Sequence, residues 1–158
     1  MLSDNQHGFC KGRSCFTALA KLTQDLFNFI GIRNGRVIAC FIDLKKAFDT
    51  VPHDKLLCKL KLYYGLDGHL LKIIGSYLKG RNLCIKIDQF ISKDYHVERS
   101  VPQGSNLGPL LFILYIDDIC SIIDNISYLF YADDLIIYFS TSYLKVDIQI
   151  MEISNGLF

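Results

Sequence analysis

The spacing of hydrophobic residues along the chain predicts both helices and strands. Apolar residues recur three or four positions apart in several segments, which is the period of a helix with one buried face. Shorter apolar runs, rich in β-branched and aromatic residues, are typical of strands. The pattern predicts helices over residues 15–30, 53–64, 68–78 and 109–123, and strands over residues 37–44, 83–88, 95–101, 128–131 and 135–139.

Polar and turn-forming residues separate these segments. Residues 1–15 are polar and contain glycine, so we predict a loop there, with Ser14 placed to cap the first helix. Ala132, Asp133 and Asp134 lie between the last two apolar runs, which predicts a hairpin with two carboxylates at its tip. The order of the elements indicates an α+β fold, with helices on one face of an antiparallel sheet.

Composition adds a charge asymmetry to this picture. The chain has 158 residues, of which 51% are apolar, and this suits one globular domain. Its net charge of +1 conceals 14 Lys and Arg against 6 Asp and Glu in residues 1–87, and 3 against 10 in residues 88–158. A basic half suits a polyanionic partner and an acidic half suits cations, but on charge alone solvated surface of either sign is the favoured explanation.

Cysteine usage and apolar run length bear on localisation. The six cysteines lack CxxC spacing, so no zinc site is predicted, and several lie in apolar runs, which predicts small buried residues. Polar residues 4–7 stand where a signal peptide needs an apolar segment. The longest apolar run, 107–116, is far shorter than the ~20 residues that span a bilayer. We therefore expect an intracellular protein, cytoplasmic or nuclear, with reduced cysteines and no membrane partner.

Three acids lie where carboxylates are costly. Asp43 ends an apolar strand, and Asp133 and Asp134 interrupt an apolar hairpin with no lysine or arginine within ten residues on either side. Half-buried carboxylates must be paired, hydrogen-bonded or metal-bound. Brought together, the three would form an oxygen-only site of the kind that Mg²⁺ prefers. Taken alone, an Asp-Asp pair is better explained as a turn cap, and the third acid at a separate strand end shifts the balance only modestly toward a metal site.

Five segments resemble, in order, the motifs of reverse transcriptases of non-LTR retrotransposons. Residues 41–53 (FIDLKKAFDTVPH) resemble the first palm motif, and residues 100–109 (SVPQGSNLGP) resemble the second. Residues 131–134 (YADD) look like the catalytic hairpin. Residues 6–14 (QHGFCKGRS) resemble the upstream fingers-side motif, and residues 76–81 (SYLKGR) a segment that follows the helical pair. One such motif is a weak signal, whereas five in family order are a strong one.

The chain departs from the family pattern at three places. Cys10 stands where many relatives have arginine, Ser100 replaces a common glycine, and Asn106 replaces a usual aliphatic residue. None of these changes touches the three acids.

The resemblance implies a fold and a division of the chain. The expected fold is a polymerase palm, with a ferredoxin-like antiparallel sheet and helices on one face. Residues 1–35 would form a partial fingers-side segment, residues 36–140 the palm, and residues 141–158 the truncated start of the helix that follows the hairpin. A thumb is expected to be absent from this chain.

The resemblance also implies an activity. The chain would be part of an RNA-directed DNA polymerase that transfers nucleotides from dNTPs to a primer 3′-hydroxyl on an RNA template. Asp43 and Asp133 would hold two Mg²⁺ ions, with Mn²⁺ as the alternative cofactor, and the carbonyl of Leu44 would add a backbone ligand. Asp134 would support the site. The oligomeric state is left open.

Further residues take roles from the resemblance. Phe48 would lie under the sugar of the incoming nucleotide and exclude a 2′-hydroxyl, with a core aromatic as the alternative. Gln103 and Gly104 would form the nucleotide-binding turn. Lys11 and Arg13 would contact phosphates, with ordinary surface charge as the alternative.

Basic residues near the helical pair would line the path of the duplex. These are Lys79, Arg81 and Lys86. His53, at the end of the first palm motif, is expected to start a helix rather than act as a general acid.

Two other functions compete with polymerisation by this chain. The first is a catalytically inactive retrotransposon remnant that keeps the palm fold and binds nucleic acid without chemistry. The second is another two-metal palm enzyme, such as a cyclic-nucleotide synthase. Phe48 and the Pro-Gln-Gly turn argue against that second alternative, because those enzymes use a Gly-Gly-containing hairpin that this chain lacks.

Overall fold

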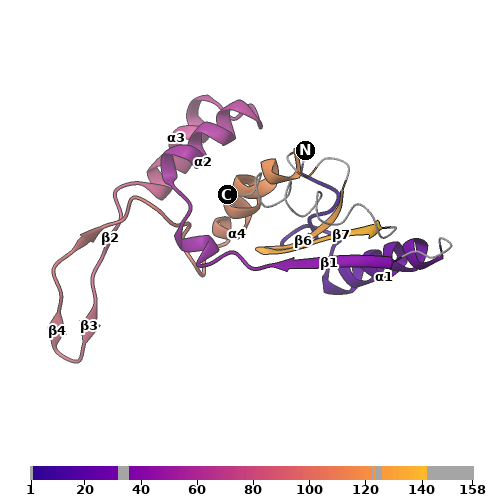
Figure 1. Ribbon diagram of the computed structural model, residues 1–158. Helices are drawn as coiled ribbons and strands as arrows, with labels where there is room; N and C mark the ends of the chain where they lie inside the picture. Colours follow the sequence, from indigo (N-terminus) through magenta and orange to yellow (C-terminus); the bar gives the residue numbers. More distant parts are fainter. Residues whose placement is uncertain (1, 32–35, 122, 124–125, 142–158) are drawn as a thin grey trace. The chain divides into compact units, whose positions relative to one another are not determined.

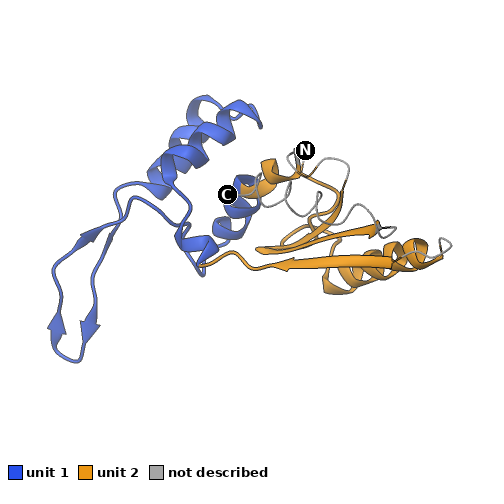
Figure 2. Cartoon of the chain, viewed as in Figure 1, with its two compact units in different colours: residues 1, 46–115 blue, residues 2–45, 116–158 orange. Residues whose placement is uncertain are grey.

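The computed structural model describes residues 2–31, 36–121, 123 and 126–141. The chain folds into two compact units, one of residues 46–115 and the other of residues 2–45 with residues 116–158 (Figure 2). We call these the helical unit and the sheet unit. The helix predicted after residue 141 lies outside the described residues.

A three-stranded antiparallel sheet forms the centre of the sheet unit (Figure 1). Strand β7 (Asp134–Thr141) lies between β1 (Arg36–Ile42) and β6 (Ser127–Tyr131). The β1–β7 register runs from Arg36 opposite Thr141 to Ile42 opposite Leu135. The predicted strand and hairpin are confirmed, but β1 ends two residues earlier than predicted because Asp43 and Leu44 leave the ladder.

Helix α1 (Cys15–Ile30) packs against one face of this sheet (Figure 1). Its start is fixed by a capping box, in which Ser14 accepts a hydrogen bond from the Thr17 amide and the Thr17 hydroxyl accepts one from the Ser14 amide. Buried Ala18 meets Leu129 and Tyr138 of the sheet. The predicted helix and its cap are both confirmed.

The buried hydroxyl of Tyr138 is satisfied by α1. It donates a hydrogen bond of 2.6 Å to the carboxylate of Asp25, which also pairs with Lys21 one turn earlier. Burial, and then the Asp25 carboxylate, raise the pKa of the Tyr138 hydroxyl. Alternate β7 residues lie on the opposite face of the sheet, and there Leu135, Ile137 and Phe139 are buried.

The N-terminal segment adds a short parallel pairing to the outer edge of β6. Gln6 forms a bridge with Phe130, in which the His7 amide donates to the Phe130 carbonyl at 2.8 Å and the Phe130 amide donates to the Asn5 carbonyl at 2.9 Å. The prediction of a loop over residues 1–15 is therefore wrong at this point. One bridge is too short to leave an alternating pattern in the sequence.

Three helices account for most of the helical unit. Helices α2 (His53–Leu62) and α3 (Gly68–Leu78) pack together, with Leu56, Leu60, Ile74 and Leu78 buried. The prediction for α3 is confirmed at both ends, whereas α2 ends two residues early. Helix α4 (Leu107–Ile116) includes Pro109 in its first turn, as predicted. The predicted end at residue 123 is wrong, because α4 ends at Ile116 and the chain continues as a 3-10 helix (Asp117–Ser121).

A narrow arm of residues 82–96 extends from the helical unit, and we call it the β-arm. Strand β2 (Asn82–Leu83) pairs with β5 (Tyr95–His96), and β3 (Lys86–Ile87) pairs with β4 (Phe90–Ile91). The predicted strands are therefore shorter than expected. The pairing is altered at Ile85 and Ser92, where the Ser92 amide donates to the Ile85 carbonyl at 2.9 Å but the Ile85 amide donates to the Ser92 hydroxyl.

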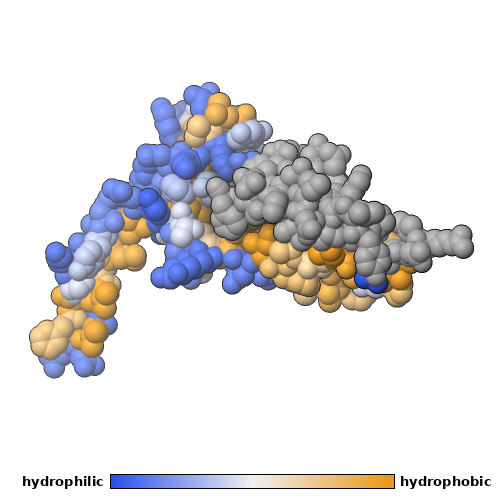
Figure 3. Space-filling view, in the orientation of Figure 1, coloured by the Kyte–Doolittle hydropathy of each residue, from blue (hydrophilic) through white to orange (hydrophobic). Residues whose placement is uncertain are grey.

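The β-arm exposes large apolar side chains along its length (Figure 3). Their exposed fractions lie between 52% and 82% for Leu83, Ile85, Ile87, Phe90, Ile91 and Tyr95. Exposed apolar surface of this extent is unusual on a folded domain.

The cysteines correct a sequence-based expectation. All six are free, and none is buried, because Cys15, Cys40, Cys58 and Cys84 are exposed and the other two are half-buried. An apolar run does not reveal which of its residues turns outward. Among the helices that the structure describes, none has the length and apolarity needed to cross a membrane.

Ser100 occupies a backbone conformation that favours glycine. Its φ is 94°, in the left-handed region where a Cβ is strained. Its amide donates to the Val51 carbonyl at 2.9 Å and its carbonyl accepts from the His53 ring at 2.8 Å, so the backbone is held in place. Glycine would fit this geometry without strain.

We predict that Ser100→Gly stabilises the protein. The left-handed backbone strains a residue with a Cβ by about 1 kcal/mol, and glycine removes that strain. The free energy of unfolding in urea should therefore rise by about that amount. Ser100→Ala is the matched control, because it removes the hydroxyl and keeps the strain. A glycine variant no more stable than the alanine variant would contradict the prediction.

Candidate active site

The three predicted catalytic acids all lie in the sheet unit. Strand β1 ends at Ile42 opposite Leu135, so Asp43 directly follows β1 at the end of the sheet where Asp134 begins β7. Asp43 and Asp134 are exposed and Asp133 is half-buried. The fold therefore brings the start of the first palm motif to the end of the sheet that carries the hairpin turn.

A tight turn presents Asp133. Tyr131 pairs with Asp134, which leaves Ala132 and Asp133 as a two-residue loop. Ala132 is buried, and its φ of 58° is left-handed, as two-residue hairpin loops require. The side chain of Asp133 follows directly from this strained residue.

The N-terminal segment holds that turn. The side-chain oxygen of Gln6 accepts from the amide of Ala132 at 3.0 Å, and the Gln6 side-chain nitrogen donates to the Ala132 carbonyl at 3.2 Å. The same oxygen accepts from the Gly8 amide at 2.8 Å. A Cβ added at Gly8 would lie 2.2 Å from the backbone nitrogen of Ala132, so only glycine fits. Sequence reasoning missed Gln6 and Gly8, although both stand in the fingers-side motif.

The two predicted phosphate-binding residues of this segment differ in their surroundings. Lys11 is exposed. Arg13 is half-buried, and its guanidinium donates to the backbone carbonyl of Ser3 at 2.8 Å and pairs with the Asp4 carboxylate at 2.8 Å. Arg13 thus ties the N-terminal segment together, and its contact with phosphate stays a prediction.

The acids suit a divalent cation in their chemistry but are not gathered into a closed set of ligands. Carboxylate oxygens are the ligands that Mg²⁺ prefers, and within the described part of the chain no lysine or arginine pairs with these three. Leu44, the predicted backbone ligand, is half-buried directly after Asp43. Over those same residues, no three His, Cys, Asp or Glu side chains lie close enough together to hold a metal ion.

The predicted nucleotide-binding turn lies in the helical unit. The Gln103 side chain donates to the Asp49 carboxylate at 2.9 Å, and Gly104 has a left-handed φ of 75° with open space beside it. The Ser105 hydroxyl supports the turn, because it donates to the Pro102 carbonyl at 2.7 Å and accepts from the Tyr77 hydroxyl at 2.6 Å. The backbone at Gly104 is thus open to close approach.

A cavity of about 400 Å³ adjoins this turn. Its lining includes Gln103, Asp49 and Arg81, so residues predicted to contact nucleotide and nucleic acid share one cavity. Arg81 lies over the Tyr77 ring at 4.7 Å and donates to the Tyr77 carbonyl at 2.7 Å. These contacts hold the guanidinium in place beside the cavity.

One face of the Phe48 ring packs against another aromatic side chain of the helical unit. Its ring stacks on Phe112 with centroids 4.2 Å apart, and its carbonyl accepts from the Val101 amide at 2.9 Å. The side chain is half-buried. Its role in excluding a 2′-hydroxyl stays a prediction.

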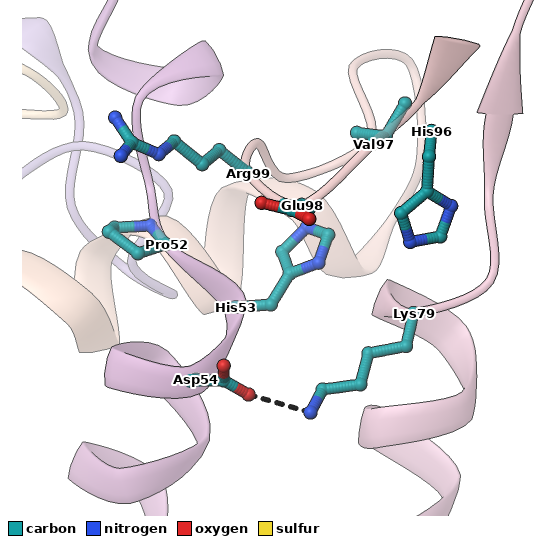
Figure 4. Close-up of a pocket in the computed structure, with 8 residues that line it drawn as sticks. All are labelled: Pro52, His53, Asp54, Lys79, His96, Val97, Glu98 and Arg99. Carbon is teal, nitrogen blue, oxygen red and sulfur yellow. Dashed lines mark hydrogen bonds and ion pairs between the residues drawn. The ribbon is translucent and has the colours of Figure 1, made fainter.

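A second cavity of the helical unit, about 420 Å³, lies between the start of α2 and the end of α3 (Figure 4). Lys79 reaches the Asp54 carboxylate at 2.6 Å, and this hydrogen bond lowers the pKa of Asp54. His53 begins α2, is buried, and donates from Nε2 to the Ser100 carbonyl, so its expected place at a helix start is confirmed. Lys86 is exposed on the β-arm.

Comparison with known proteins agrees with the motifs. The family model described as reverse transcriptase (RNA-dependent DNA polymerase) matches residues 1–154. A probable RNA-directed DNA polymerase from transposon BS of Drosophila melanogaster is 33% identical over 124 residues, which cover 75% of this chain and 13% of that protein. A probable RNA-directed DNA polymerase from transposon X-element of the same organism is 32% identical over 115 residues, covering 73% of this chain and 12% of that protein. The chain therefore spans about an eighth of these relatives.

A solved structure supports the fold. The structure of apo telomerase from Candida tropicalis, truncated from the C-terminal domain, matches 96% of this chain and 32% of that chain with a TM-score of 0.68 at 12% identity. The arrangement of helices and sheet is therefore palm-like. Together with the family model, this places the chain among proteins built on a polymerase palm. The chain belongs to the reverse transcriptase family.

His7 is a buried titratable group next to Gln6, the residue that holds the hairpin turn. The Thr17 hydroxyl donates to the Ser14 carbonyl, so the Nδ1–H of His7 donates to Thr17 at 2.9 Å. Nε2 is buried with no partner among the described residues. Burial, followed by the charges of Arg13 and Lys21, lowers the pKa of His7.

We predict that this histidine makes stability depend on pH. The folded protein keeps His7 neutral while the unfolded chain protonates it below pH ~6.5, so the free energy of unfolding should fall as the pH drops from about 7 to 5. His7→Asn keeps a donor for Thr17 and cannot titrate, so its loss over that range should be smaller. Urea titrations of both proteins at the two pH values provide the measurement. Equal losses would show that other groups carry the effect.

Proposed function

We propose that this chain provides the catalytic palm of an RNA-directed DNA polymerase of the non-LTR retrotransposon type. In this proposal it extends a primer 3′-hydroxyl with dNTPs on an RNA template. One observation carries the proposal, namely the β1–β7 register that ends at Ile42 opposite Leu135, with Asp43 directly after β1, Asp134 at the start of β7 and Asp133 in the adjoining turn. Membership of the reverse transcriptase family supports it.

The acids take separate roles in this proposal. Reverse transcriptases use divalent metal ions, and Mg²⁺ suits the all-oxygen donor set of Asp43 and Asp133 with the Leu44 carbonyl. When bound, two such ions neutralise charge at the attacking and leaving oxygens of nucleotidyl transfer. Asp134 supports the site from the start of β7. The palm in this proposal has the ferredoxin-like arrangement of its family.

Nucleotide and nucleic acid would meet the helical unit. Gly104 leaves room for substrate beside its backbone, and Gln103 and Arg81 offer donors at one cavity. Lys86 is exposed and would meet phosphates directly, whereas Lys79 would first have to exchange its pairing with Asp54. In the sheet unit, Lys11 is likewise exposed. RNA template, DNA primer and dNTPs are thus the proposed partners.

A second candidate is a palm that binds nucleic acid without catalysis. It is favoured by the absence, within the described residues, of three acids close enough together to hold a metal ion. The two candidates differ in whether nucleotides are incorporated at all.

We predict that the purified chain extends a DNA primer on an RNA template with Mg²⁺ and dNTPs. Asp133→Asn removes a ligand charge, so incorporation should fall by about 100-fold or more. Asp94→Asn makes the same chemical change at an exposed residue of the β-arm and should leave the rate intact. Incorporation that survives Asp133→Asn would overturn the assignment of the metal ligands. Nucleic-acid binding without any incorporation would favour the second candidate.

We also predict that Phe48→Ala relaxes the exclusion of ribonucleotides. Removing the ring opens space for a 2′-hydroxyl, so the ratio of ribonucleotide to deoxyribonucleotide incorporation should rise about tenfold. Phe112→Leu is the control, because it breaks the same ring stack and leaves Phe48 present. If the two variants change the ratio equally, Phe48 acts through packing and not through contact with the sugar.

A further inference from the structure

We propose that Gln6 is a positioning residue for the catalytic hairpin. Its side-chain amide fixes the left-handed turn at Ala132 and thereby sets where Asp133 points. The catalytic meaning of this inference rests on the function proposed above, while the geometry of the clamp stands by itself.

The turn needs a partner of this chemistry. Ala132 is only 7% exposed, so water does not satisfy its amide and carbonyl, and neither group belongs to the β6–β7 ladder. Gln6 accepts from the amide and donates to the carbonyl of this one residue. A carboxamide presents an acceptor and a donor side by side and so mimics the edge of a neighbouring strand. No other side-chain type except asparagine offers both groups in this arrangement.

Gln6 is itself held firmly against the strand that carries the hairpin. It is 2% exposed, and backbone hydrogen bonds on both sides of it join Asn5 and His7 to Phe130 of β6. The Gly8 amide donates to the side-chain oxygen of Gln6 and fixes the rotamer. The clamp is therefore built on the same strand whose turn it holds, and its position does not depend on the helical unit.

Gly8 brings the two segments close enough for these bonds. Any Cβ at this position would collide with the Ala132 backbone nitrogen at 2.2 Å, with its Cα at 2.8 Å and with its Cβ at 2.9 Å. Gly8 and Gln6 thus act together. The absence of a Cβ at Gly8 lets the two segments approach, and the Gln6 side-chain amide then forms the hydrogen bonds to Ala132.

The clamp also explains how alanine keeps a left-handed conformation. Non-glycine residues adopt this region reluctantly, and a strained backbone persists only where its surroundings over-determine it. Without the two Gln6 bonds, Ala132 has a lower-energy conformation available. Its relaxation would rotate the peptide that leads into Asp133 and spread the orientations of that carboxylate.

The experiment measures two quantities on the purified 158-residue chain. The first is the Mn²⁺ affinity, by electron paramagnetic resonance, and the second is the rate of hydrogen exchange at the Ala132 amide. In Gln6→Ala, Mn²⁺ binding should weaken about tenfold, as for other residues that orient a metal ligand. Exchange at the Ala132 amide should accelerate by about tenfold or more, because that amide loses its acceptor. Gln6→Glu keeps the acceptor and the side-chain size but cannot donate to the Ala132 carbonyl. Gln6→Glu serves as the second variant if the alanine variant does not fold. Its Mn²⁺ affinity should also weaken, because the bond to the Ala132 carbonyl is lost. Its rate of hydrogen exchange at the Ala132 amide should stay nearer to that of the parent, because the acceptor remains.

Two further variants separate positioning from general loss of stability. Tyr138→Phe removes a buried hydrogen bond at the other end of the hairpin and should leave Mn²⁺ affinity unchanged. Adding Ala132→Gly to Gln6→Ala supplies a residue that adopts left-handed φ without strain, and this should restore Mn²⁺ affinity by about threefold or more. A structural role alone would give no such rescue.

The outcomes distinguish this inference from the function beneath it. If Asp133→Asn abolishes Mn²⁺ binding while Gln6→Ala leaves both affinity and Ala132 exchange unchanged, the clamp is refuted and the proposed function stands. If Asp133→Asn leaves Mn²⁺ binding unchanged, the proposed metal site fails, and Ala132 exchange alone then decides whether Gln6 holds the turn.

Discussion

Antiparallel pairing of β1 with β7 is the interaction on which the geometry of the site depends. Asp43 directly follows β1 and Asp134 begins β7, so the register brings both acids to the same end of the sheet. A slip of β7 by one residue would turn Asp134 toward the face where Leu135 and Ile137 are now buried. The hydrophobic alternation of β7 therefore determines both the core of the sheet and the face on which Asp134 lies.

The two compact units divide the site residues between them. The sheet unit carries the three acids and the hairpin clamp, while the helical unit carries Phe48 and the Gln103–Gly104 turn. The first palm motif crosses the boundary between Asp43 and Phe48, through Lys46 with its left-handed φ of 51°. Neither unit contains a complete set of predicted site residues.

Local patterns predicted most of the fold, and long-range contacts explain what they missed. Helical periodicity predicted the bounds of α1 and α3, and Ser14 marked the start of α1, because these signals lie among residues that are close together in the sequence. The bond from Gln6 to Ala132 joins residues 126 positions apart and leaves no local trace. The motif resemblance singled out the acids, but it carried no information on the buried amide that supports them. Ser100 departs from the family pattern, and its left-handed φ explains why glycine suits this position better than serine.

The β-arm has a consequence for how this protein behaves at high concentration. Its short ladders leave main-chain amides and carbonyls open along both edges, flanked by isoleucine and phenylalanine side chains and by only one lysine and one aspartate between Leu83 and Ile91. Open edges with low net charge are templates for strand addition from another molecule. The arm therefore presents edges of the kind that favour edge-to-edge association between molecules, an effect that grows with concentration.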